Sequence, residues 1–468
     1  MIRNRAHQQV MSSLHALYGC WQLPSIDISK GFMQRIVIIG GGAGGLALAT
    51  QLGKRLGKKK QASITLVDSA RTHVWKPLFH QLAAGSFDTH AEEIEYLAQA
   101  RWNHFKFRLG SLIGVDRVNK TVQLAASHDA RRREITPAQS LAYDALIIAV
   151  GSQTNDFGTP GAEEHTIKLD SPGAAKYFNA RLINACLRAQ TLPREPGKSM
   201  LTVTIVGGGA TGVELAAELH SSARIMGNYG FENIDPEKDL QIALVEAGPR
   251  LLAQLPERLG HAAEKELKQL GIDVYTSEKV VSVAEDSLTM ASGKVIPSTL
   301  TVWAAGVKAA DFLRTLGGDQ PLEVNKLNQL VVNPNLQTSL DPNIYAFGDC
   351  AACQQSNGSW VPPRAQAAYQ QAMYLAKSLP KLMAGIAVKP YVYTDQGSLV
   401  SLAEYSSVGS LMGSLSKGSF FVEGQIAKLM YWGLHKQHQL ALGGVKKTAL
   451  ITLSEMIDRA HRPRIKLH

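Results

Sequence analysis

The sequence is poor in cysteine, with 4 cysteines in 468 residues. So few cysteines exclude the disulfide frameworks that stabilise small secreted domains, and they suit a reducing compartment. No run of about 18 consecutive apolar residues occurs, which argues against a membrane-spanning helix. The length predicts two or three domains, and a hydrophobic content of 45% is typical of a globular protein with a substantial core.

Acidic residues are also in short supply. The chain has 49 lysines and arginines against 39 aspartates and glutamates, a net charge of +10. Such an excess attracts nucleic acid, anionic lipid or anionic substrates, so its position along the chain matters. Residues 425–468 hold 8 basic and 2 acidic residues, which is more than half of the excess. No nucleic-acid-binding motif accompanies this charge, and we therefore predict no nucleic-acid partner.

Residues 1–33 differ from the rest of the chain. Two arginines near the start precede a mildly apolar patch, but polar residues interrupt the patch and no small-residue cleavage site follows it. We interpret this segment as a disordered extension rather than a signal peptide. Met33 lies two residues before the first predicted strand, which makes it an alternative start of translation.

An internal repeat organises the chain. Residues 35–52 (RIVIIGGGAGGLALATQL) and 202–219 (TVTIVGGGATGVELAAEL) are identical at 9 of 18 positions without gaps. Each copy runs from a β-branched segment through glycines into sequence rich in alanine and leucine, which is the pattern of a strand, a tight turn and a helix. We therefore predict an α/β fold with two Rossmann-like dinucleotide-binding domains.

Both copies contain the G-x-G-x-x-G arrangement of a dinucleotide-binding loop. The first glycine permits the sharp turn, the second lets the backbone approach a pyrophosphate, and the third lets helix and strand pack closely. The phosphates then lie at the helix N-terminus, where free N–H groups and the helix dipole favour anions. The predicted binding residues are Gly40, Gly42, Ala43, Gly44 and Gly45 in the first copy and Gly207, Gly209, Ala210, Thr211 and Gly212 in the second.

An acidic residue ends the second strand of each predicted domain, where it accepts hydrogen bonds from a ribose. Asp68 follows its last loop glycine by 23 residues, near the spacing of about 20 that such domains show, whereas Glu246 follows by 34. A loop over residues 227–238 accounts for the excess. Because a carboxylate repels a 2′-phosphate, Glu246 predicts NADH rather than NADPH, although Arg250 four residues on weakens this prediction.

Together these features resemble the flavoproteins with two dinucleotide-binding domains, in which the N-terminal copy holds FAD and the inserted copy holds NAD(P)H. Three further strand segments fit that family, namely residues 143–151 (YDALIIAVG), 301–306 (TVWAAG) and 344–349 (IYAFGD). The resemblance implies that Gly151 and Asp349 contact FAD, with Asp349 on the ribityl chain, and that Gly306 contacts NADH. It also implies the domain boundaries, with FAD-binding segments 34–155 and 307–385 around an NADH-binding domain over 156–306.

Disulfide reductases of this architecture need a redox-active cysteine pair beside the flavin. Residues 78–85, where one branch carries the pair, contain no cysteine, and Cys186 stands alone before the second glycine loop. Cys350 and Cys353 form a C-x-x-C that directly follows Asp349. A redox or metal role stays open for them, but we favour small packing residues and predict no metal site.

Residues 365–370 (AQAAYQ) resemble the quinone-site helix of type II NADH dehydrogenases. Gln366 and Gln370 lie four residues apart and so share one helix face. Their amides hydrogen-bond a quinone carbonyl without adding charge to an apolar slot. An ordinary solvated helix face is the alternative.

From residue 34 to its end the chain resembles the bacterial type II NADH:quinone oxidoreductases, including segments VWKPLFH, DQGSLVSL, SLMGSLSK and RPRIKLH. The resemblance implies non-covalent FAD and NADH as cofactors, a membrane quinone as electron acceptor, and contact between Lys76 and FAD. Without spanning helices or intramembrane carboxylates there is no path for proton pumping. A sulfide:quinone oxidoreductase or another flavin-dependent reductase of this fold is the alternative function, and a redox-sensing binding protein is a second.

Glu214 follows the last glycine of the second loop by two residues. This position allows its carboxylate to face the nicotinamide, which makes it a candidate catalytic residue. The alternative is a carboxylate that remains near the helix N-terminus because the helix dipole favours it there.

Residues 386–468 are predicted to form an α+β membrane-anchoring region. Apolar residues recur near helical spacing within residues 425–442, and Leu450, Leu453 and Ile457 form a second stripe. Amphipathic helices with basic flanks suit an interface with anionic lipid, which for a quinone reductase predicts the cytoplasmic face of the plasma membrane. Two ordinary helices packed on the core are the alternative, and the oligomeric state is open between a monomer and a homodimer.

Overall fold

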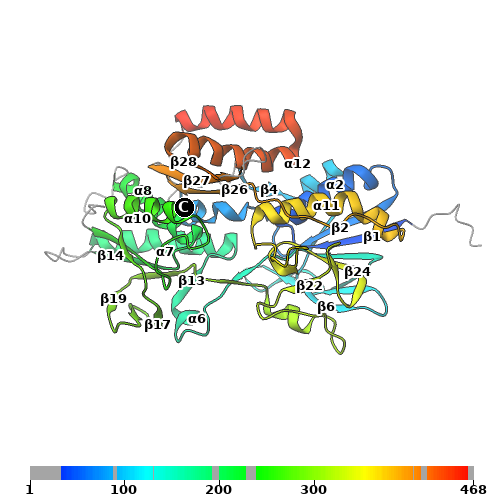
Figure 1. Ribbon diagram of the computed structural model, residues 1–468, viewed down its shortest axis with the longest axis horizontal. Helices are drawn as coiled ribbons and strands as arrows, with labels where there is room; N and C mark the ends of the chain where they lie inside the picture. Colours follow the sequence, from blue (N-terminus) through cyan, green and yellow to red (C-terminus); the bar gives the residue numbers. More distant parts are fainter. Residues whose placement is uncertain are drawn as a thin grey trace, which may run out of the picture. The chain divides into compact units, whose positions relative to one another are not determined.

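Each copy of the internal repeat supplies a central strand of a β-sheet (Figure 1). β1 (Gln34–Ile39) and β14 (Leu201–Val206) are rich in β-branched residues and mostly buried, as central strands of a parallel sheet require. α2 (Ala43–Leu52) and α8 (Ala210–Gly227) follow directly after the glycine loops. The predicted strand, turn and helix are present in both copies.

The computed structural model describes residues 33–87, 92–129, 131–191, 200–227, 239–403, 405–412 and 419–461. The rest of the predicted N-terminal extension, nearly all of the loop over residues 227–238 and the basic end RPRIKLH lie outside the described residues. Residues 34–468 form a unit separate from residues 1–33.

The two sheets share one topology. The first has the strand order β25-β22-β23-β24-β11-β1-β2-β5, and the second has the order β13-β20-β14-β15-β16. The part β11-β1-β2-β5 is parallel throughout and matches β20-β14-β15-β16, which is also parallel. The bounds not yet given are β2 (Ala62–Asp68), β5 (Lys106–Leu109), β11 (Ala145–Ile148), β13 (Thr166–Lys168), β15 (Leu240–Val245), β16 (Asp273–Tyr275), β20 (Leu300–Trp303), β22 (Leu330–Val332), β23 (Gln337–Thr338), β24 (Asp341–Ala346) and β25 (Ala351–Cys353). The second sheet thus falls in sequence between β11 and β24 of the first.

We call each of the two sheets, with the strands and helices around it, a sheet unit. In each sheet unit a three-stranded antiparallel meander comes directly before the strand with which the chain returns to the sheet, β11 in the first and β20 in the second. The first meander is β6 (Leu112–Asp116), β7 (Thr121–Leu124) and β10 (Gln139–Ala142), and the second is β17 (Val280–Val283), β18 (Ser287–Met290) and β19 (Val295–Pro297). The repeat therefore extends far beyond the 18 residues in which the sequences match. Short pairs complete the strands, namely β3 (Thr72–His73) with β4 (Ile94–Glu95) and β8 (Ser127–His128) with β9 (Glu134–Thr136).

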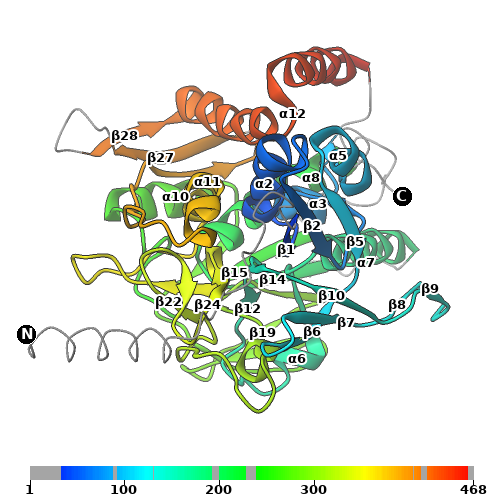
Figure 2. The ribbon, with the colours of Figure 1, turned by 90° about the vertical axis from the view of Figure 1, so that its right-hand side faces the viewer.

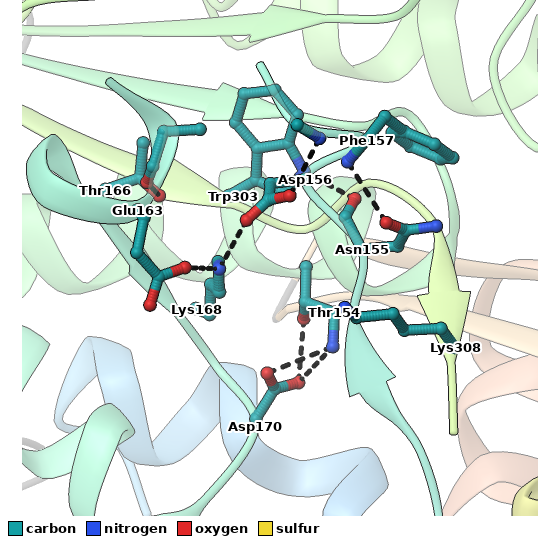
Figure 3. Close-up of polar contacts among 12 residues, drawn as sticks. Thr154, Asn155, Asp156, Phe157, Glu163, Thr166, Lys168, Asp170, Trp303 and Lys308 are labelled. Atoms are coloured by element: carbon teal, nitrogen blue, oxygen red, sulfur yellow. Dashed lines mark hydrogen bonds and ion pairs between the residues drawn. The ribbon is translucent and has the colours of Figure 1, made fainter. Parts of the chain in front are cut away.

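A small antiparallel ribbon joins the two sheet units. β12 (Gln153–Thr154) pairs with β21 (Val307–Lys308) where the chain passes between the sheets. Figure 3 shows the polar contacts that hold it. The Thr154 amide and hydroxyl donate to the Asp170 carboxylate at 2.9 and 2.7 Å, and the Trp303 indole donates to the Asn155 carbonyl oxygen at 3.0 Å. These contacts fix both chain passages to the second sheet unit.

Helices surround the sheets. They are α3 (Phe79–Ala84), α5 (Tyr96–Asn103), α6 (Ala162–His165), α7 (Pro172–Thr191), α10 (Glu257–Gln269) and α11 (Ala365–Met383). α3 comes from the first copy in sequence but packs between α7 and α8. Phe79 and Leu82 of α3 share a buried cluster with Phe178, Val213 and Leu215. α3, which belongs to the first sheet unit in sequence, thus packs in the core of the second and ties the two units together.

The C-terminal part adds a second layer to α8. β26 (Gly397–Leu402), β27 (Ser406–Met412) and β28 (Ser419–Glu423) form an antiparallel sheet, and α12 (Gly424–His461) packs on it. Gly444, with φ of 73°, breaks α12 into two helical halves. No helix in the described part of the chain combines the length and the apolar character that a bilayer crossing needs.

Candidate functional site

The glycines of the first loop each meet a distinct requirement. Gly40 has φ of +100°, and a Cβ there would lie 2.7 Å from the Ala149 carbonyl carbon, so only glycine is tolerated. A Cβ on Gly45 would overlap the Gly40 carbonyl oxygen, because helix and strand cross closely at this point. Gly42 faces open space, with no atom within 4 Å of a built Cβ. The loop therefore leaves one uncovered backbone position at the start of α2, as a bound pyrophosphate requires.

The second loop repeats this geometry. Gly207 has φ of +115°, and a Cβ there would lie 2.7 Å from Ala305 Cα. A Cβ on Gly212 would overlap the Gly207 carbonyl oxygen, and Gly209 faces open space. The backbone requirements of a dinucleotide loop are thus met in both copies.

The two strand-end carboxylates are held in the same way. The Gly41 amide donates to Asp68 Oδ2 at 2.6 Å and the Ala70 amide to Oδ1 at 2.8 Å. In the second copy the Gly208 and Gly248 amides each donate to Glu246 at 2.6 Å. Each carboxylate therefore ties the residue between the first and second loop glycines, Gly41 or Gly208, to the chain that follows the second strand. These hydrogen bonds hold Asp68 and Glu246 beside the glycine loops, as the sequence predicts.

The surroundings of the two loops differ. In the first, the buried Tyr96 donates its hydroxyl to the Gly41 carbonyl oxygen at 2.8 Å, and Phe347 covers Gly44. Burial is the largest influence on the Asp68 carboxyl and raises its pKa. In the second, the residues at the start of α8 are all exposed, namely Gly209, Ala210 and Thr211. Gly42 is exposed like Gly209, but Ala43 is half-buried and Gly44 is buried, so the first loop is the more enclosed of the two.

Arg250 is occupied within its own turn. Its guanidinium donates to the carbonyl oxygens of Leu252, Ala253 and Leu255 at 3.0, 2.8 and 2.9 Å. A guanidinium that binds a 2′-phosphate needs these donors free. Because its donors are already engaged, Arg250 no longer weakens the prediction of NADH over NADPH.

A polar cluster forms where three distant segments meet. Lys76 Nζ donates to the Ser152 carbonyl oxygen at 2.9 Å, and the Ser152 hydroxyl donates to Asp349 Oδ2 at 2.7 Å. Gly151, with φ of +74° and open space around its α-carbon, turns the chain into this cluster. The structure thus brings together Lys76, Gly151 and Asp349, three of the predicted FAD residues, and adds Ser152. Sequence reasoning missed Ser152 because a lone serine after a strand carries no signal.

Glu214 lies in a buried junction of three elements. Its carboxylate accepts the Ser401 amide of β26 at 3.0 Å and lies 3.4 Å from His80 Nδ1 of α3. The Tyr431 hydroxyl of α12 also donates to it. Glu218, one turn further along α8, accepts the Ser86 hydroxyl. The carboxylate therefore faces other elements and not the N-terminus of its own helix.

Burial controls the protonation of this junction. It raises the pKa of Glu214 from its usual 4.5 to about 8, with the Ser401 amide opposing the shift. Burial also lowers the pKa of His80 to about 4 and holds that of Tyr431 well above 10. At neutral pH Glu214 is thus a protonated carboxylic acid beside a neutral imidazole. Sequence reasoning singled out Glu214 but missed His80 and Tyr431, which come from distant segments.

The two glutamines of α11 bond to the segment that precedes β26. Gln370 bonds to the Thr394 backbone at both ends of its amide, donating at 2.7 Å and accepting at 3.1 Å. Gln366 Oε1 accepts the Tyr393 hydroxyl at 2.9 Å, whereas its Nε2 has only a 3.4 Å contact with Gln396. They share a helix face as predicted, but only Gln366 keeps a weakly used donor. Next to them the buried Gln371, which we did not single out, accepts the Gly348 amide at 2.8 Å.

Gly306 ends the return strand of the second sheet and begins the ribbon β12–β21. Its φ is +67°, and a Cβ would lie 2.5 Å from the Phe157 ring. The position is thus fixed by backbone geometry and close packing, and a role toward NADH stays a prediction.

All three cysteines of the described residues are free and buried. Burial raises the pKa of Cys350 to about 12 and those of Cys353 and Cys186 to about 11. The Cys350 thiol donates to the Phe347 carbonyl oxygen at 3.3 Å. Thiols in such surroundings stay protonated and unreactive, which supports packing residues over a redox pair. Within the described residues no group of metal-ligating side chains gathers.

α12 turns apolar side chains outward and polar ones inward. Lys436, His438 and Gln439 are buried, and Lys436 pairs with Glu455 of the second half at 2.5 Å. We define the apolar face of α12 as its large, strongly exposed aliphatic side chains, Ile426, Leu429, Leu440, Leu450, Leu453 and Ile457, which are between 41% and 69% exposed. α12 also packs on β26, β27 and β28 and buries Ala427 and Leu442, as the alternative of helices packed on the core expects, so membrane contact stays a prediction.

A buried aromatic and histidine stack fastens α12 to the first sheet unit. Trp75 stacks with both His435 and His438, with ring centroids 5.4 and 5.5 Å away, and His438 Nε2 lies 3.0 Å from His73 Nε2. Because Trp75 directly precedes Lys76 in the chain, this stack holds α12 close to Lys76.

Comparisons with known proteins agree with this geometry. The sequence profile of the family described as pyridine nucleotide-disulphide oxidoreductase matches residues 34–372. The type II NADH:quinone oxidoreductase of Haemophilus influenzae is 42% identical over 448 residues, covering 93% of this chain and 100% of that protein. The Mycobacterium tuberculosis enzyme Ndh of the same name is 28% identical over 90% of this chain and 86% of its own.

Solved structures show the same fold at low identity. The structure of NDH2 from Plasmodium falciparum in complex with NADH aligns with a TM-score of 0.78 at 20% identity, covering 93% of this chain and all of that one. The sulfide:quinone oxidoreductase of Aquifex aeolicus aligns with 0.66 at 18% identity, covering 92% and 95%. The chain belongs to the pyridine nucleotide-disulphide oxidoreductase family and, within it, to the type II NADH:quinone oxidoreductases.

Proposed function

We propose that this protein oxidises NADH and passes the electrons through bound FAD to a membrane quinone, without pumping protons. The observation that carries the proposal is the pair of loops with the same glycine and carboxylate geometry, of which the first is more enclosed than the second. An enclosed site suits a resident cofactor, and an accessible site suits a substrate that must leave after each turnover. The description of the family to which the chain belongs names a pyridine nucleotide, which agrees with an NADH site.

The first sheet unit is the proposed FAD-binding domain, over residues 34–155 and 307–385. The residues fit the cofactor because Gly42 leaves an uncovered position at the N-terminus of α2 and Asp68 lies beside it. FAD, when bound, accepts a hydride and returns its electrons to a second substrate. The residues that would hold FAD are Gly40, Gly42, Ala43, Gly44, Gly45 and Asp68 at the adenosine and pyrophosphate part, and Lys76, Gly151 and Asp349 at the flavin and ribityl part.

The second sheet unit, over residues 156–306, is the proposed NADH-binding domain. Gly207, Gly209, Ala210, Thr211 and Gly212 would hold the pyrophosphate, Glu246 the ribose, and Gly306 the nicotinamide end. NADH is favoured over NADPH because the Glu246 carboxylate repels a 2′-phosphate and the Arg250 guanidinium is engaged with carbonyl oxygens.

Glu214 is the proposed proton carrier of the reaction. Reduction of a quinone to a quinol consumes two protons, and a group that gives up a proton near neutral pH suits this task. Burial among His80, Ser401 and Tyr431 keeps the Glu214 carboxyl protonated, since its pKa is raised to about 8. The same side chains close the junction to bulk water.

Gln366 and Gln370 are proposed to act at the quinone site in two ways. Gln366 offers its weakly used Nε2 donor to a quinone carbonyl. Gln370 is a positioning residue, because both ends of its amide hold the Thr394 backbone in place.

Residues 386–468 are proposed to dock on the cytoplasmic surface of the plasma membrane, where the quinone resides. The apolar face of α12 supports this, because six exposed aliphatic side chains favour transfer to lipid by roughly 0.8 kcal/mol for each CH₂ buried. A homodimer stays a prediction, to be checked by sedimentation equilibrium.

Steady-state assays test the function. We expect purified protein with its flavin to oxidise NADH with ubiquinone or menaquinone analogues as acceptors, and to use NADPH poorly. Truncation near residue 424 should release the protein from membranes. Sulfide oxidation in place of NADH oxidation would favour the alternative reductase of the same fold.

A further inference from the structure

Cationic side chains gather beside the second half of α12. Three segments, residues 51–61, 96–108 and 443–452, together contain ten lysines and arginines and no aspartate or glutamate. They include the turn after α2, the helix α5 and the part of α12 that follows its break at Gly444. Since only the third segment belongs to the C-terminal region, the basic character is not a property of the tail alone.

The cations surround an exposed tryptophan. We define the basic surface as Lys54, Lys58, Lys59, Lys60, Arg101 and Trp102, all of which are exposed. Its five cations make no ion pair with a carboxylate of the described chain. Arg55 is left out because its guanidinium donates to the Ala376 carbonyl oxygen.

Close packing makes the basic surface continuous with α12. A Cβ on Gly53 would lie 3.1 Å from the Asn103 carbonyl carbon, and Gly57 packs in the same way on the next residue, so glycines let the lysine run approach the end of α5. Lys447 Nζ of α12 lies 3.7 Å from the centre of the Trp102 ring, a cation–π contact. Figure 2 shows α2 and α5 beside the second part of α12.

We propose that the basic surface binds the anionic headgroups of bilayer lipids and so forms a second membrane contact. The proposal rests on the membrane docking proposed above for the apolar face of α12. Lysines and arginines near an anionic leaflet are attracted to it within about a Debye length, roughly 10 Å. Tryptophan is enriched at the level of the headgroups, and Trp102 and Leu97 are 59% and 67% exposed.

A lipid surface fits better than a nucleic acid. The neighbouring apolar face of α12 gains nothing from a phosphate backbone, whereas a bilayer accommodates apolar and basic groups side by side. Two separate contacts also define the orientation of the protein on the membrane, which a single helix that can roll about its axis does not. The basic surface thus sets how the quinone site meets the bilayer.

The test compares vesicle binding of the full-length flavoprotein and a charge variant. The variant is Lys54→Gln with Lys58→Gln, Lys59→Gln and Lys60→Gln. Vesicles of phosphatidylcholine alone and of phosphatidylcholine with phosphatidylglycerol are used in flotation assays. We expect phosphatidylglycerol to tighten binding of the natural protein, and the variant to lose at least about 10-fold of that gain, since each charge near the surface contributes up to roughly 5-fold.

A matched control removes four exposed lysines from other elements. It is Lys265→Gln with Lys279→Gln, Lys326→Gln and Lys389→Gln, all exposed and with the same change in net charge. We expect its gain from phosphatidylglycerol to stay within about 2-fold of the natural protein. NADH oxidation with a soluble quinone analogue in detergent should be unchanged in both variants, which shows that they are folded.

Tryptophan quenching gives a second readout. Brominated lipids quench indoles at the membrane surface, so Trp102→Phe should remove a large part of the quenched fluorescence. Trp360→Phe is the control, because Trp360 is similarly exposed, at 56%, but lies outside the basic surface. Equal quenching losses for the two variants would contradict the proposal.

The outcomes separate this proposal from the one on which it rests. No binding of the natural protein to either vesicle would overturn the docking of α12 and the basic surface with it. Equal binding to both vesicles, or an unchanged charge variant, would overturn the basic surface alone. Loss of duplex DNA or RNA binding by the charge variant, with vesicle binding intact, would overturn the lipid in favour of a nucleic acid.

Discussion

The two glycine loops have the same backbone and different surroundings. Gly45 and Gly212 pack against their strands in the same way, and Asp68 and Glu246 are held by equivalent amides. Tyr96 and Phe347 cover Gly41 and Gly44 of the first loop, whereas the start of α8 is exposed in the second. The backbone of the two loops is therefore the same and the side chains around them differ, which fits the proposal of a resident ligand at the first loop and an exchanging ligand at the second.

The helices that follow the loops differ in one decisive residue. The position two residues after the last loop glycine is Ala47 in the first copy and Glu214 in the second. Ala47 is buried in an apolar core, whereas Glu214 is buried among polar groups of three elements. The first copy thus provides a scaffold, and the second adds an ionisable group to it.

Gly45→Val and Gly212→Val should separate the two loops most strongly. In each variant the new side chain overlaps a backbone carbonyl oxygen, which cannot move away cheaply. We expect Gly45→Val to be isolated without flavin, and Gly212→Val to keep flavin but lose reduction by NADH. Flavin absorbance per protein and bleaching by NADH measure this. Equal flavin loss in both would contradict the assignment of one ligand to each loop.

Glu214→Gln should slow quinone reduction by about 100-fold, a usual contribution of a positioned acid or base. Flavin reduction by NADH should change little. In the natural protein the rate should fall as the pH rises through about 8, where Glu214 loses its proton, and this limb should be absent in the variant. A pH profile that is unchanged in Glu214→Gln would contradict the role.

The same substitution changes the pH dependence of stability. The folded protein keeps the Glu214 proton up to a pH of about 8, and the unfolded chain releases it above about 4.5. Unfolding therefore releases a proton in this window, and the free energy of unfolding falls as the pH rises, by roughly 1.4 kcal/mol for each pKa unit. Glu214→Gln should flatten this fall, measured by urea denaturation at pH 5 and pH 9.

Asp68→Ala and Glu246→Ala should have smaller effects, of about 10-fold. Each removes two charge-assisted hydrogen bonds to loop amides and the predicted ribose contact. Asp68→Ala should lose flavin during dialysis. Glu246→Ala should raise the KM for NADH and reduce the preference over NADPH, because the repulsion of a 2′-phosphate is gone. A raised KM in Asp68→Ala with full flavin content would reverse the assignment.

Cys350→Ser with Cys353→Ser should have the smallest effect. Both thiols are buried, with pKa values raised to about 12 and about 11, and neither is disposed to react. We expect kcat for quinone reduction to stay within about 2-fold. Loss of activity with intact flavin would favour a cysteine mechanism and the alternative reductases of this fold.

The sequence predicts the parts of this molecule that depend on local backbone demands. The glycine loops, the strand-end acids and the parallel central strands of the two sheets follow from φ requirements, close approach and buried β-branched runs. Tyr96, Ser152 and Gln371 escaped prediction because each acts through a contact with a distant segment. Such contacts leave no periodic pattern along the chain.

The C-terminal helix α12 is a second example of a feature that the sequence predicts only in part. Its amphipathic pattern predicts a stripe of apolar residues but not the direction in which that stripe points. The direction follows from the inward ion pair of Lys436 with Glu455 and from the stack of Trp75 with His435 and His438. Only the tertiary structure supplies these partners.

The most direct test of the central claim is an anaerobic single-turnover experiment on the purified flavoprotein. NADH is added until the flavin absorbance is bleached, and a quinone analogue is then mixed in. We expect the quinone to restore the oxidised flavin spectrum in full, with one quinol formed for each flavin. We expect the double variant Cys350→Ser with Cys353→Ser to behave in the same way. A flavin that NADH bleaches but that no quinone restores would contradict it, and would favour a protein that senses NADH without turning it over.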